Sequence, residues 1–414
     1  MEYGLIGERL GHSFSKEIHS KLFDYSYELR EIAPEALREF MLARDFKAIN
    51  VTIPYKQAVM PYLDEIDPAA LSIGAVNTVV NRGGKLIGYN TDFLGLRALV
   101  LKNGVDFSGK KVLILGSGGT SKTALTVAHD LGAGVVLRVS RSEGEGTVTY
   151  NEVYKNHTDA QIIINTTPCG MFPKNGSSAI NIEEFSSLCG CFDAVYNPLR
   201  SALVLAAQKR GIPAEGGLYM LVAQAVFAAE HFTGEKIERG TIDRVYKELL
   251  SQKQNLVLIG MPGCGKTALG TMVAEELGFS FLDTDEIIRI REGKTPAQLI
   301  TEYGEPAFRE MEAAAVKEAA AHQSTVIATG GGAILREENL TALRENGKII
   351  FLDRPIEQLA TTADRPLSSD REKLEKRYRE RYPIYCAAAD EKINCVRQKA
   401  ENVLKIKEAF LNEN

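Results

Sequence analysis

The sequence has few cysteines, no excess of basic charge and no long apolar run. Its six cysteines form no repeated spacing, and Cys189 and Cys191 have no second pair to complete a zinc site. A disulfide framework is therefore excluded, and we expect free thiols in a reducing compartment. Lys and Arg total 49 against 54 Asp and Glu, a net charge of −5, so no global field favours nucleic acid or an anionic membrane.

A membrane-spanning segment is also missing, because a bilayer crossing needs roughly 20 consecutive apolar residues. The longest apolar stretch, 218–229, is shorter than this and is interrupted by Gln224. The chain opens with Glu2 and Gly4 and lacks the basic and then apolar profile of a signal peptide. We therefore expect a cytoplasmic protein with no membrane partner.

What is present is the composition of a folded protein with several domains. Apolar residues make up 44% and charged residues 25% of the chain, and at about 150 residues per domain the length suggests about two or three domains. Short β-rich runs alternate with helix-length amphipathic segments, which predicts parallel α/β architecture. The candidate strands are Tyr3–Ile6, Ala48–Val51, Val112–Leu115, Val135–Val139, Ile162–Asn165, Leu256–Ile259, Val326–Thr329 and Ile349–Leu352.

Two of these strands run into glycine loops, at Gly116 and Gly260, and each loop followed by a helix is a potential phosphate-binding site. Between the loops, a polar turn, a helix over Ile242–Leu250 and a short tether form the best domain boundary. We expect a substrate lobe over 1–100, a Rossmann-like dinucleotide lobe over 101–232, a closing helix and linker over 233–255, and a P-loop domain with a parallel sheet over 256–414. A helix over 217–250 should pack back on the first lobe.

The second glycine loop, Gly260-Met-Pro-Gly-Cys-Gly-Lys266-Thr267, follows a strand and precedes a helix over Ala268–Leu277, which is the context of a P-loop. Its glycines let backbone N–H groups approach phosphates. Lys266 would neutralise the β- and γ-phosphates, and Thr267 would hold Mg²⁺. The predicted ATP contacts in this loop are Gly263, Cys264, Gly265, Lys266, Thr267 and Ala268.

Asp283 and Asp285 stand two positions apart, which would place both carboxylates on one face of an extended segment at a strand end. One can hold Mg²⁺, and we assign this role to Asp283 with Thr267. The other, Asp285, can take the proton of an acceptor hydroxyl. Alone, such a pair indicates a turn or a helix cap, but a P-loop before it favours phosphoryl transfer.

Further motifs in this half are Gly304-Glu-Pro-Ala-Phe-Arg309, Ala328-Thr-Gly330-Gly331-Gly332, Asp364-Arg365-Pro366-Leu367 and Arg381-Tyr-Pro-Ile-Tyr385. With them, the second half resembles shikimate kinase along its whole length. The resemblance implies that Asp285 contacts the ring hydroxyls and that Arg309 and Arg381 bind the shikimate carboxylate with Gly331. It also implies that Arg365 lies in a lid over ATP. Where the family usually has an arginine before the lid threonine, this chain has Ala360.

The first glycine loop lies in a strand–turn–helix unit close to the dinucleotide-binding fingerprint, with Ser121 at the third glycine position. Its expected cofactor contacts are Gly116, Ser117, Gly118, Gly119 and Thr120. The next strand ends in Arg141 and Ser142, where units that bind NAD carry an acid. An arginine can pair with a 2′-phosphate, so the cofactor is predicted to be NADP(H), although Gly144 and Glu145 stand where a second arginine often occurs.

A ketone reduction needs a group that delivers a proton to the forming alkoxide, and a lysine paired with an aspartate can do so. Lys56 and Asp92 are the candidates, but they are far apart in the sequence. The sequence alone therefore leaves open a surface lysine and an aspartate that caps a helix.

The motifs around these residues are Gly11-His-Ser13-Phe-Ser15, Asn50-Val-Thr52-Ile-Pro-Tyr-Lys56, Gly74-Ala-Val-Asn77-Thr78, Asn90-Thr91-Asp92, Asn165-Thr-Thr-Pro-Cys-Gly-Met171, Tyr196-Asn-Pro198 and 217–224. They resemble shikimate dehydrogenase from Met1 to about Leu250. The resemblance implies that Ser13 and Ser15 hold the substrate carboxylate, and that Lys56 and Asp92 form the catalytic pair. It assigns the ring hydroxyls to Thr52, Asn77, Asp92, Tyr196 and Gln224, and it adds Gly217 to the cofactor contacts.

The two resemblances support each other, because the product of one reaction is the substrate of the other. The predicted function is reduction of 3-dehydroshikimate to shikimate with NADPH, followed by phosphorylation of shikimate to shikimate 3-phosphate with ATP and Mg²⁺. One alternative is a quinate or shikimate dehydrogenase fused to the kinase. Another is a regulator that binds metabolites without turnover, although a regulator needs no acid/base or metal groups. The sequence leaves the choice between monomer and homodimer open.

Overall fold

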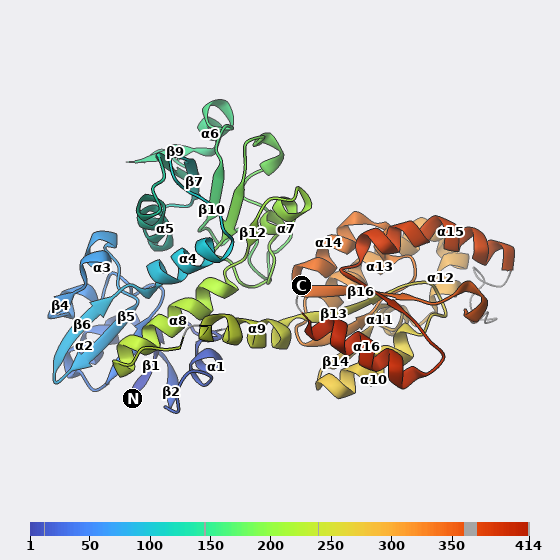
Figure 1. The fold of residues 1–414 in the computed structure, drawn as a ribbon, viewed down its shortest axis with the longest axis horizontal. Coiled ribbons are helices and arrows are strands. Elements are labelled where there is room, and N and C mark those ends of the chain that lie inside the picture. The colour runs from blue at the N-terminus through green and yellow to red at the C-terminus, as the bar shows by residue number, and fades with distance from the viewer. Residues whose placement is uncertain (12, 145, 239, 360–370, 413–414) are drawn as a thin grey trace. The chain divides into compact units, whose positions relative to one another are not determined.

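The computed structural model describes residues 1–11, 13–144, 146–238, 240–359 and 371–412, and they divide into two compact units, Met1–Leu249 and Leu250–Asn414 (Figure 1). Among these described residues, no helix combines the length and apolarity that a bilayer crossing requires. Over the ranges just given, the first unit contains two sheets and the second contains one.

The first sheet has the strand order β2-β1-β3-β5-β6-β4 and mixes parallel and antiparallel pairs. Its strands are β1 (Tyr3–Gly7), β2 (Tyr27–Glu31), β3 (Ala48–Val51), β4 (Glu65–Ile66), β5 (Thr78–Arg82) and β6 (Lys85–Tyr89). Helices α1 (Ser15–His19), α2 (Leu37–Ala43) and α3 (Pro68–Ile73) connect them. The hairpin β5–β6 turns at Gly83 and Gly84, whose φ angles are 62° and 92°, a conformation that glycine adopts without strain.

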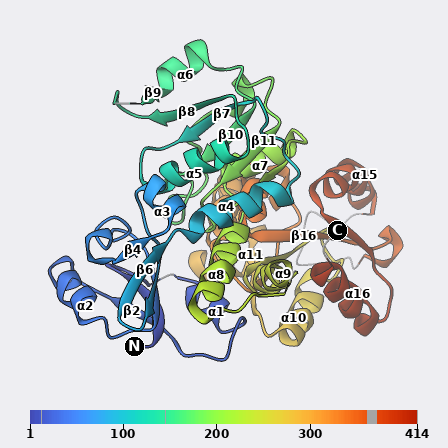
Figure 2. The ribbon, with the colours of Figure 1, turned by 60° about the vertical axis from the view of Figure 1, so that its left-hand side comes forward.

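The second sheet is parallel throughout, in the order β12-β11-β10-β7-β8-β9. Its strands are β7 (Lys111–Leu115), β8 (Val135–Ser140), β9 (Thr147–Thr149), β10 (Ile162–Asn165), β11 (Gly190–Asp193) and β12 (Ala214–Glu215). Helices α5 (Gly119–Asp130), α6 (Tyr150–Asn156) and α7 (Ala202–Lys209) belong to this sheet (Figure 2). The central strand β10 is buried along its whole length, as a parallel strand covered on both faces should be.

Two long helices pack against each other between the two sheets of the first unit, α4 (Thr91–Lys102) and α8 (Leu218–Thr233) (Figures 1 and 2). Helix α8 ends at Gly234, where φ is 77°, and α9 (Thr241–Lys253) starts separately. The range 217–250 is therefore not one continuous helix, and α9 corresponds to the separate helix expected over Ile242–Leu250. Helix α8 also contacts α1, β3 and β5, which are elements of the first sheet.

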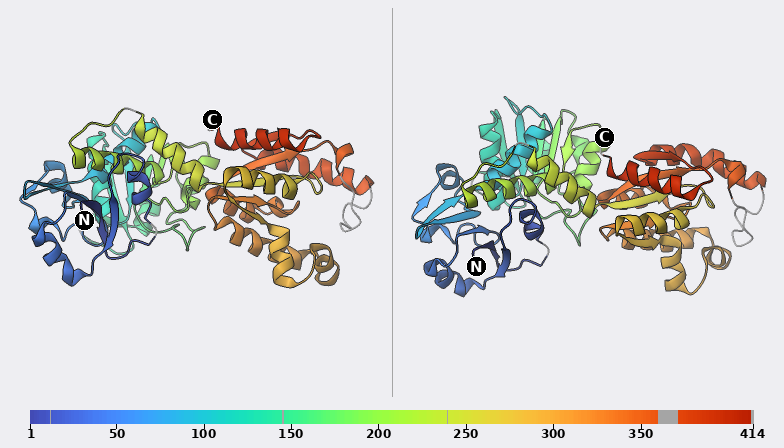
Figure 3. Two further views of the ribbon diagram at one scale, coloured as in Figure 1. Left: turned by 90° about the horizontal axis from the view of Figure 1, so that it is seen from below. Right: turned by 60° about the horizontal axis from the view of Figure 1, so that its bottom comes forward.

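The second unit has a parallel sheet in the order β14-β15-β13-β16-β17, with helices on both faces (Figure 3). Its strands are β13 (Asn255–Ile259), β14 (Ser280–Asp283), β15 (Thr325–Ala328), β16 (Gly347–Asp353) and β17 (Glu391–Asn394). Its helices are α10 (Lys266–Leu277), α11 (Thr284–Glu292), α12 (Pro296–Tyr303), α13 (Glu305–Ala320), α14 (Glu337–Asn346), α15 (Arg371–Ala388) and α16 (Lys399–Leu411). The expected α/β class, with parallel-rich sheets and a P-loop domain, is confirmed.

Candidate functional sites

Lys56 and Asp92 meet in the first unit, although 36 positions separate them in the chain. Lys56 lies in the turn after β3, and Asp92 lies in the first turn of α4, where Asn90 caps the helix by accepting from the Phe93 N–H. The Lys56 Nζ donates to Asp92 Oδ2 at 2.5 Å. The two side chains are 23% and 13% exposed, so the ion pair is partly shielded and its ammonium can still reach a ligand.

A network of buried amides and hydroxyls surrounds the start of α4. The Asn77 Nδ2 donates to Thr91 Oγ1 at 3.0 Å, and Asn77 Oδ1 accepts from the Thr91 N–H at 2.7 Å. Gln224 reaches this network from α8, since its Oε1 accepts from Asn77 Nδ2 at 3.5 Å. Sequence reasoning selected Asn77 and Gln224 but assigned no role to Thr91 or Thr78, which also belongs to the network. The network fixes polar groups one residue from Asp92.

The two predicted carboxylate-binding serines lie together at the start of α1. Ser13 Oγ donates to Ser15 Oγ at 3.0 Å and accepts from the Ser15 N–H at 3.2 Å. The ring of Phe14, between them, contacts that of Tyr196 with centroids 5.5 Å apart, and burial raises the pKa of Tyr196. Thr52 follows β3 and is half-buried. No hydrogen bond between described residues joins the serines to Lys56 or Asp92.

The dinucleotide loop leaves bare backbone facing open space. Gly116 has a φ of 113°, and a Cβ there would lie 2.8 Å from Thr166 Oγ1, so this position requires glycine. Gly118 and Gly119 have nothing within 4 Å of the place a Cβ would take, and Ser117 between the glycines is exposed. Ser121, at the third glycine position, is buried and donates to the Gly118 carbonyl at 2.6 Å. The loop can therefore accept a phosphate group.

The residues predicted to distinguish the cofactor lie at the same edge of the sheet as this loop. Arg141 and Ser142 are exposed and follow β8, which pairs in parallel with β7. Thr120 lies in the first turn of α5. Gly217, by contrast, is buried where a Cβ would clash with the backbone of Ala194. Close packing thus gives one structural reason for glycine at position 217.

Sequence reasoning missed a buried carboxylate, Asp193, at the end of β11. It is fully buried and accepts hydrogen bonds from Asn165 Nδ2 at 2.9 Å, from the Val195 N–H at 2.9 Å and from Ser201 Oγ at 2.5 Å. Burial raises the pKa of Asp193 to about 6, and the three hydrogen bonds oppose this shift. The signal available in the sequence was an aspartate ending an apolar run.

We expect Asp193 to make the stability of the first unit depend on pH. The unfolded chain releases this proton near pH 3.8 and the folded chain only near pH 6, so the free energy of unfolding should fall as pH rises through this window. The loss is roughly 3 kcal/mol at most. Asp193→Asn can keep all three hydrogen bonds and should flatten this dependence. Calorimetry of the full chain between pH 4.5 and 7 measures this dependence, and the shift caused by NADP⁺ identifies the unfolding transition of the first unit. As a control, Asp130→Asn replaces an exposed aspartate and should keep the wild-type dependence on pH.

In the second unit, the P-loop forms the turn between β13 and α10. Gly260, Gly263 and Gly265 have φ angles of 147°, 83° and 103°, so the left-handed turns of the loop depend on glycine. The Lys266 Nζ donates to the carbonyls of Gly260 and Met261 at 2.9 and 3.1 Å, while Cys264 is buried beneath the loop. The lysine amine lies over the loop, and its charge is available to an anion held there.

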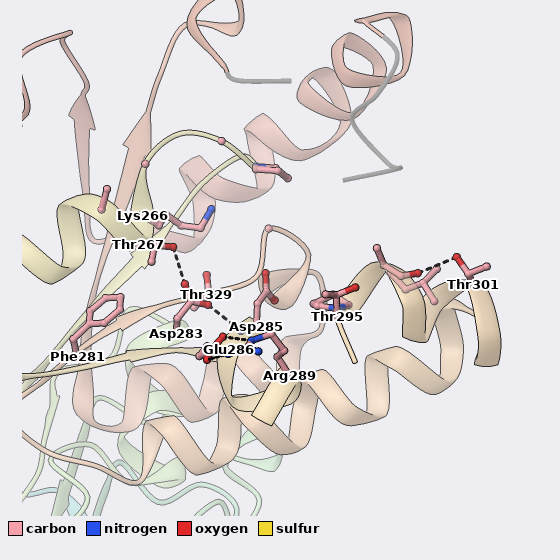
Figure 4. Close-up of a pocket in the computed structure, with 18 residues that line it drawn as sticks. Lys266, Thr267, Phe281, Asp283, Asp285, Glu286, Arg289, Thr295, Thr301 and Thr329 are labelled. Carbon is pink, nitrogen blue, oxygen red and sulfur yellow. Dashed lines mark hydrogen bonds and ion pairs between the residues drawn. The ribbon is translucent and has the colours of Figure 1, made fainter. Parts of the chain in front are cut away.

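The two aspartates of the predicted acceptor site lie beside this loop, but their arrangement differs from the prediction. They do not share one face of an extended segment, because Asp283 ends β14 and caps α11, and Asp285 lies in the first helical turn. Asp283 Oδ1 accepts from the Asp285 N–H at 3.0 Å, and its Oδ2 accepts from Thr267 Oγ1 at 2.7 Å (Figure 4). Helix capping thus separates the two carboxylates.

A cavity of about 740 Å³ joins the P-loop to these aspartates. Figure 4 shows Lys266, Thr267 and Asp285 directed into it. Its lining also includes Arg289 of α11, Thr295, which caps α12, Ile300 of α12, and Gly331. The cavity is large enough for a small ligand next to a phosphate-binding loop.

Two arginines from separate helices converge on the turn Gly330–Gly332. The Arg381 Nη1, from α15, donates to the Gly331 carbonyl at 2.9 Å. Arg309, from α13, pairs with Glu312 at 2.7 Å and with Glu305 at 2.6 Å. Glu312 is 1% exposed, and burial raises its pKa. Sequence reasoning missed both glutamates, although their spacings of i+3 and i−4 from Arg309 on one helix are a recognisable signal. Arg365 lies outside the described residues.

These sites define a chain with two catalytic modules, a two-lobed dehydrogenase with a dinucleotide loop and a P-loop kinase. Residues 5–79 match the shikimate dehydrogenase substrate binding domain, and residues 262–410 match shikimate kinase. The NADP(+) shikimate dehydrogenase of Clostridium perfringens (strain SM101) is 36% identical over 265 residues, which cover 60% of this chain and 97% of that protein. The chain therefore belongs to the shikimate dehydrogenase family, and it also carries a shikimate kinase domain.

Two solved structures resemble the first unit. A chorismate mutase/shikimate 5-dehydrogenase fusion protein from Clostridium acetobutylicum is 35% identical with a TM-score of 0.57, and the match covers 60% of this chain and 96% of that one. Shikimate 5-dehydrogenase from Thermus thermophilus, solved with NADP(H) and shikimate, is 26% identical with a TM-score of 0.55, covering 60% and 99%. Both resemblances expected from the sequence are confirmed, and NADP and ATP follow as the nucleotides of the two modules.

Proposed function

We propose that the chain catalyses two consecutive reactions of the shikimate pathway. The first unit reduces 3-dehydroshikimate to shikimate with NADPH, and the second phosphorylates shikimate to shikimate 3-phosphate with ATP. The observation that carries the proposal is that one chain holds both an acid/base pair, Lys56 and Asp92, and a P-loop cavity lined by Asp285. We also place the enzyme in the cytoplasm, a reducing compartment that suits its free cysteines.

In the reduction, bound NADPH supplies the hydride to the ketone carbon. Lys56 then delivers a proton from its ammonium to the oxygen that gains negative charge, and becomes a neutral amine that solvent reprotonates. Asp92 holds the ammonium at 2.5 Å and so fixes the direction of the proton. Because the pair is partly exposed, the lysine can regain its proton after each turnover.

The other polar groups of the first unit orient the substrate. We assign the carboxylate to Ser13 and Ser15, whose hydroxyls lie 3.0 Å apart. The ring hydroxyls are assigned to Thr52, Asn77, Asp92, Tyr196 and Gln224. Asn77 and Gln224 suit a substrate hydroxyl. A hydrogen-bonded network holds their buried amides in place, and a bound hydroxyl would give them a further polar partner that offsets the cost of burial.

The cofactor is assigned to the loop Gly116–Thr120 and to Arg141, Ser142 and Gly217. The open face at Gly118 and Gly119 fits a pyrophosphate. The exposed guanidinium of Arg141 fits a 2′-phosphate, which favours NADPH over NADH.

In the kinase, the backbone of Gly263–Ala268 and the amine of Lys266 hold the phosphates of ATP, which supplies the phosphoryl group. Thr267 Oγ1 and Asp283 Oδ2, 2.7 Å apart, provide two oxygen donors that suit Mg²⁺. Asp285 takes the proton of the attacking hydroxyl. Arg309, Gly331 and Arg381 hold the substrate carboxylate, and Arg365 is assigned to the ATP lid.

A coupled assay tests both activities in the full chain. With 3-dehydroshikimate, NADPH, ATP and Mg²⁺, we expect NADPH oxidation and ADP formation together, and no ADP before 3-dehydroshikimate is reduced. NADH should support less turnover than NADPH, and quinate should be oxidised more slowly than shikimate. Faster oxidation of quinate would favour a quinate dehydrogenase. Binding of substrates without oxidation of NADPH or formation of ADP would contradict the proposal and favour a metabolite-binding regulator.

A further inference from the structure

The strand order of the second unit places different segments on the two sides of the P-loop. Strand β13 leads into the loop and lies between β15 and β16. Asp283, Asp285 and the turn Gly330–Gly332 follow β14 and β15, so the proposed acceptor site lies on that side. The end of the nucleotide that reacts must face this side. The rest of the triphosphate must therefore extend toward the loop that follows β16.

The first residue of that loop is Arg354, and it contacts the P-loop directly. Its Nε donates to the Cys264 carbonyl at 3.0 Å. Its Nη2 lies 3.9 Å from the place where a Cβ on Gly265 would stand. Gly265 precedes α10, whose N-terminal N–H groups are part of the phosphate-binding loop. The guanidinium is thus placed over the outer side of the loop, beside the start of the helix.

The charge of Arg354 has no counter-ion among the residues that the structure describes. Its Nε hydrogen bond is to a neutral carbonyl, and neither Nη group donates to a described residue. Arg354 is also only half-buried. A guanidinium with free donors next to a phosphate-binding loop is suited to bind a phosphate oxygen.

We propose that Arg354 is a nucleotide-binding residue of the kinase, whose Nη groups bind the α- and β-phosphates while its Nε holds the P-loop carbonyl of Cys264. This proposal rests on the proposed kinase function. Among the described residues, it adds a basic side chain at the triphosphate beside Lys266, on the opposite side of the loop from the acceptor. Lys266 serves the β- and γ-phosphates.

Direct binding measurements on the full chain test the proposal. Arg354→Ala should weaken the affinity for ADP and for inorganic triphosphate, which has no base, each by about ten- to a hundredfold, as expected when a hydrogen bond to a charged group is lost. Arg354→Gln keeps an amide donor for the Cys264 carbonyl without the charge, and should weaken binding similarly. The KM for ATP should rise, whereas the KM for shikimate and the dehydrogenase rate should stay constant.

The matched control is Arg344→Ala. Arg344 likewise donates to a single backbone carbonyl, that of Ala388, but lies at the end of α14, at the opposite edge of the sheet. If Arg354→Ala bound ADP as tightly as the wild type, the phosphate contact would be refuted. Wild-type ADP affinity in Arg354→Gln would refute it as well. So would weaker ADP binding with unchanged triphosphate binding, which would place the arginine at the base. The affinity measurements for ADP and triphosphate need no turnover, so a wild-type chain that binds ADP but does not phosphorylate shikimate would refute the proposed function alone.

Discussion

Replacing Lys56 by methionine should lower kcat of the dehydrogenase by about 10²- to 10⁴-fold, the usual contribution of a general acid. Methionine has a similar length and no proton to give, so the substrate still fits while the forming alkoxide loses its donor. Asp92 keeps its place, because it lies on α4 and the cap of that helix, Asn90, does not involve Lys56. The rate of NADPH oxidation with 3-dehydroshikimate measures the effect.

Two controls make this prediction specific. Lys85→Met removes a lysine of the same lobe that forms an exposed ion pair with Glu65, and it should leave the rate unchanged. The kinase rate of Lys56→Met with added shikimate should equal that of the wild type, because the kinase residues belong to a separate compact unit. A Lys56→Met enzyme that binds NADP⁺ normally and keeps its reductase rate would show that another group supplies the proton.

The Lys56–Asp92 pair was harder to predict from the sequence than the P-loop, and the structure shows why. The P-loop is contiguous, so its glycines, Lys266 and Thr267 could be placed on a turn between β13 and α10 from sequence alone, and the structure has that turn. Lys56 and Asp92 meet only because the turn after β3 packs against the start of α4. No local pattern encodes this packing, and only the family resemblance indicated it.

Both the correct and the wrong predictions depend on whether the signal is local in the sequence. The strands with continuous apolar runs, such as β10 and β13, were predicted within one residue of their bounds. The hairpin β5–β6 was not predicted, because Asn81, Arg82 and Lys85 interrupt its apolar pattern. Asp285 was placed on an extended segment, whereas capping by Asp283 starts α11 one residue earlier. Buried acids such as Asp193 escape prediction, since their partners come from distant segments.

The second large effect should come from Asp285→Asn, which is expected to lower kcat of the kinase by about 10²- to 10⁴-fold. The amide can still hydrogen-bond a hydroxyl but cannot accept its proton. The change is nearly isosteric, which matters because the carboxylate lies against the turn at Gly330, where a Cβ would come within 2.7 Å of Asp285 Oδ1. The affinity for ADP should be unchanged, and the KM for shikimate should rise only modestly. ADP formation with shikimate and ATP measures the effect.

The neighbouring residue provides the control for this substitution. Glu286 lies on the same helix, lines the same cavity and pairs with Arg289 at 2.5 Å. Glu286→Gln makes the same chemical change and should leave kcat within a few-fold of wild type, because its carboxylate is already committed to an ion pair. Equal losses in both variants would mean that any charge removed from this cavity slows the reaction. A loss confined to Asp285→Asn, with ADP affinity retained, requires that the carboxylate of Asp285 itself accepts the proton.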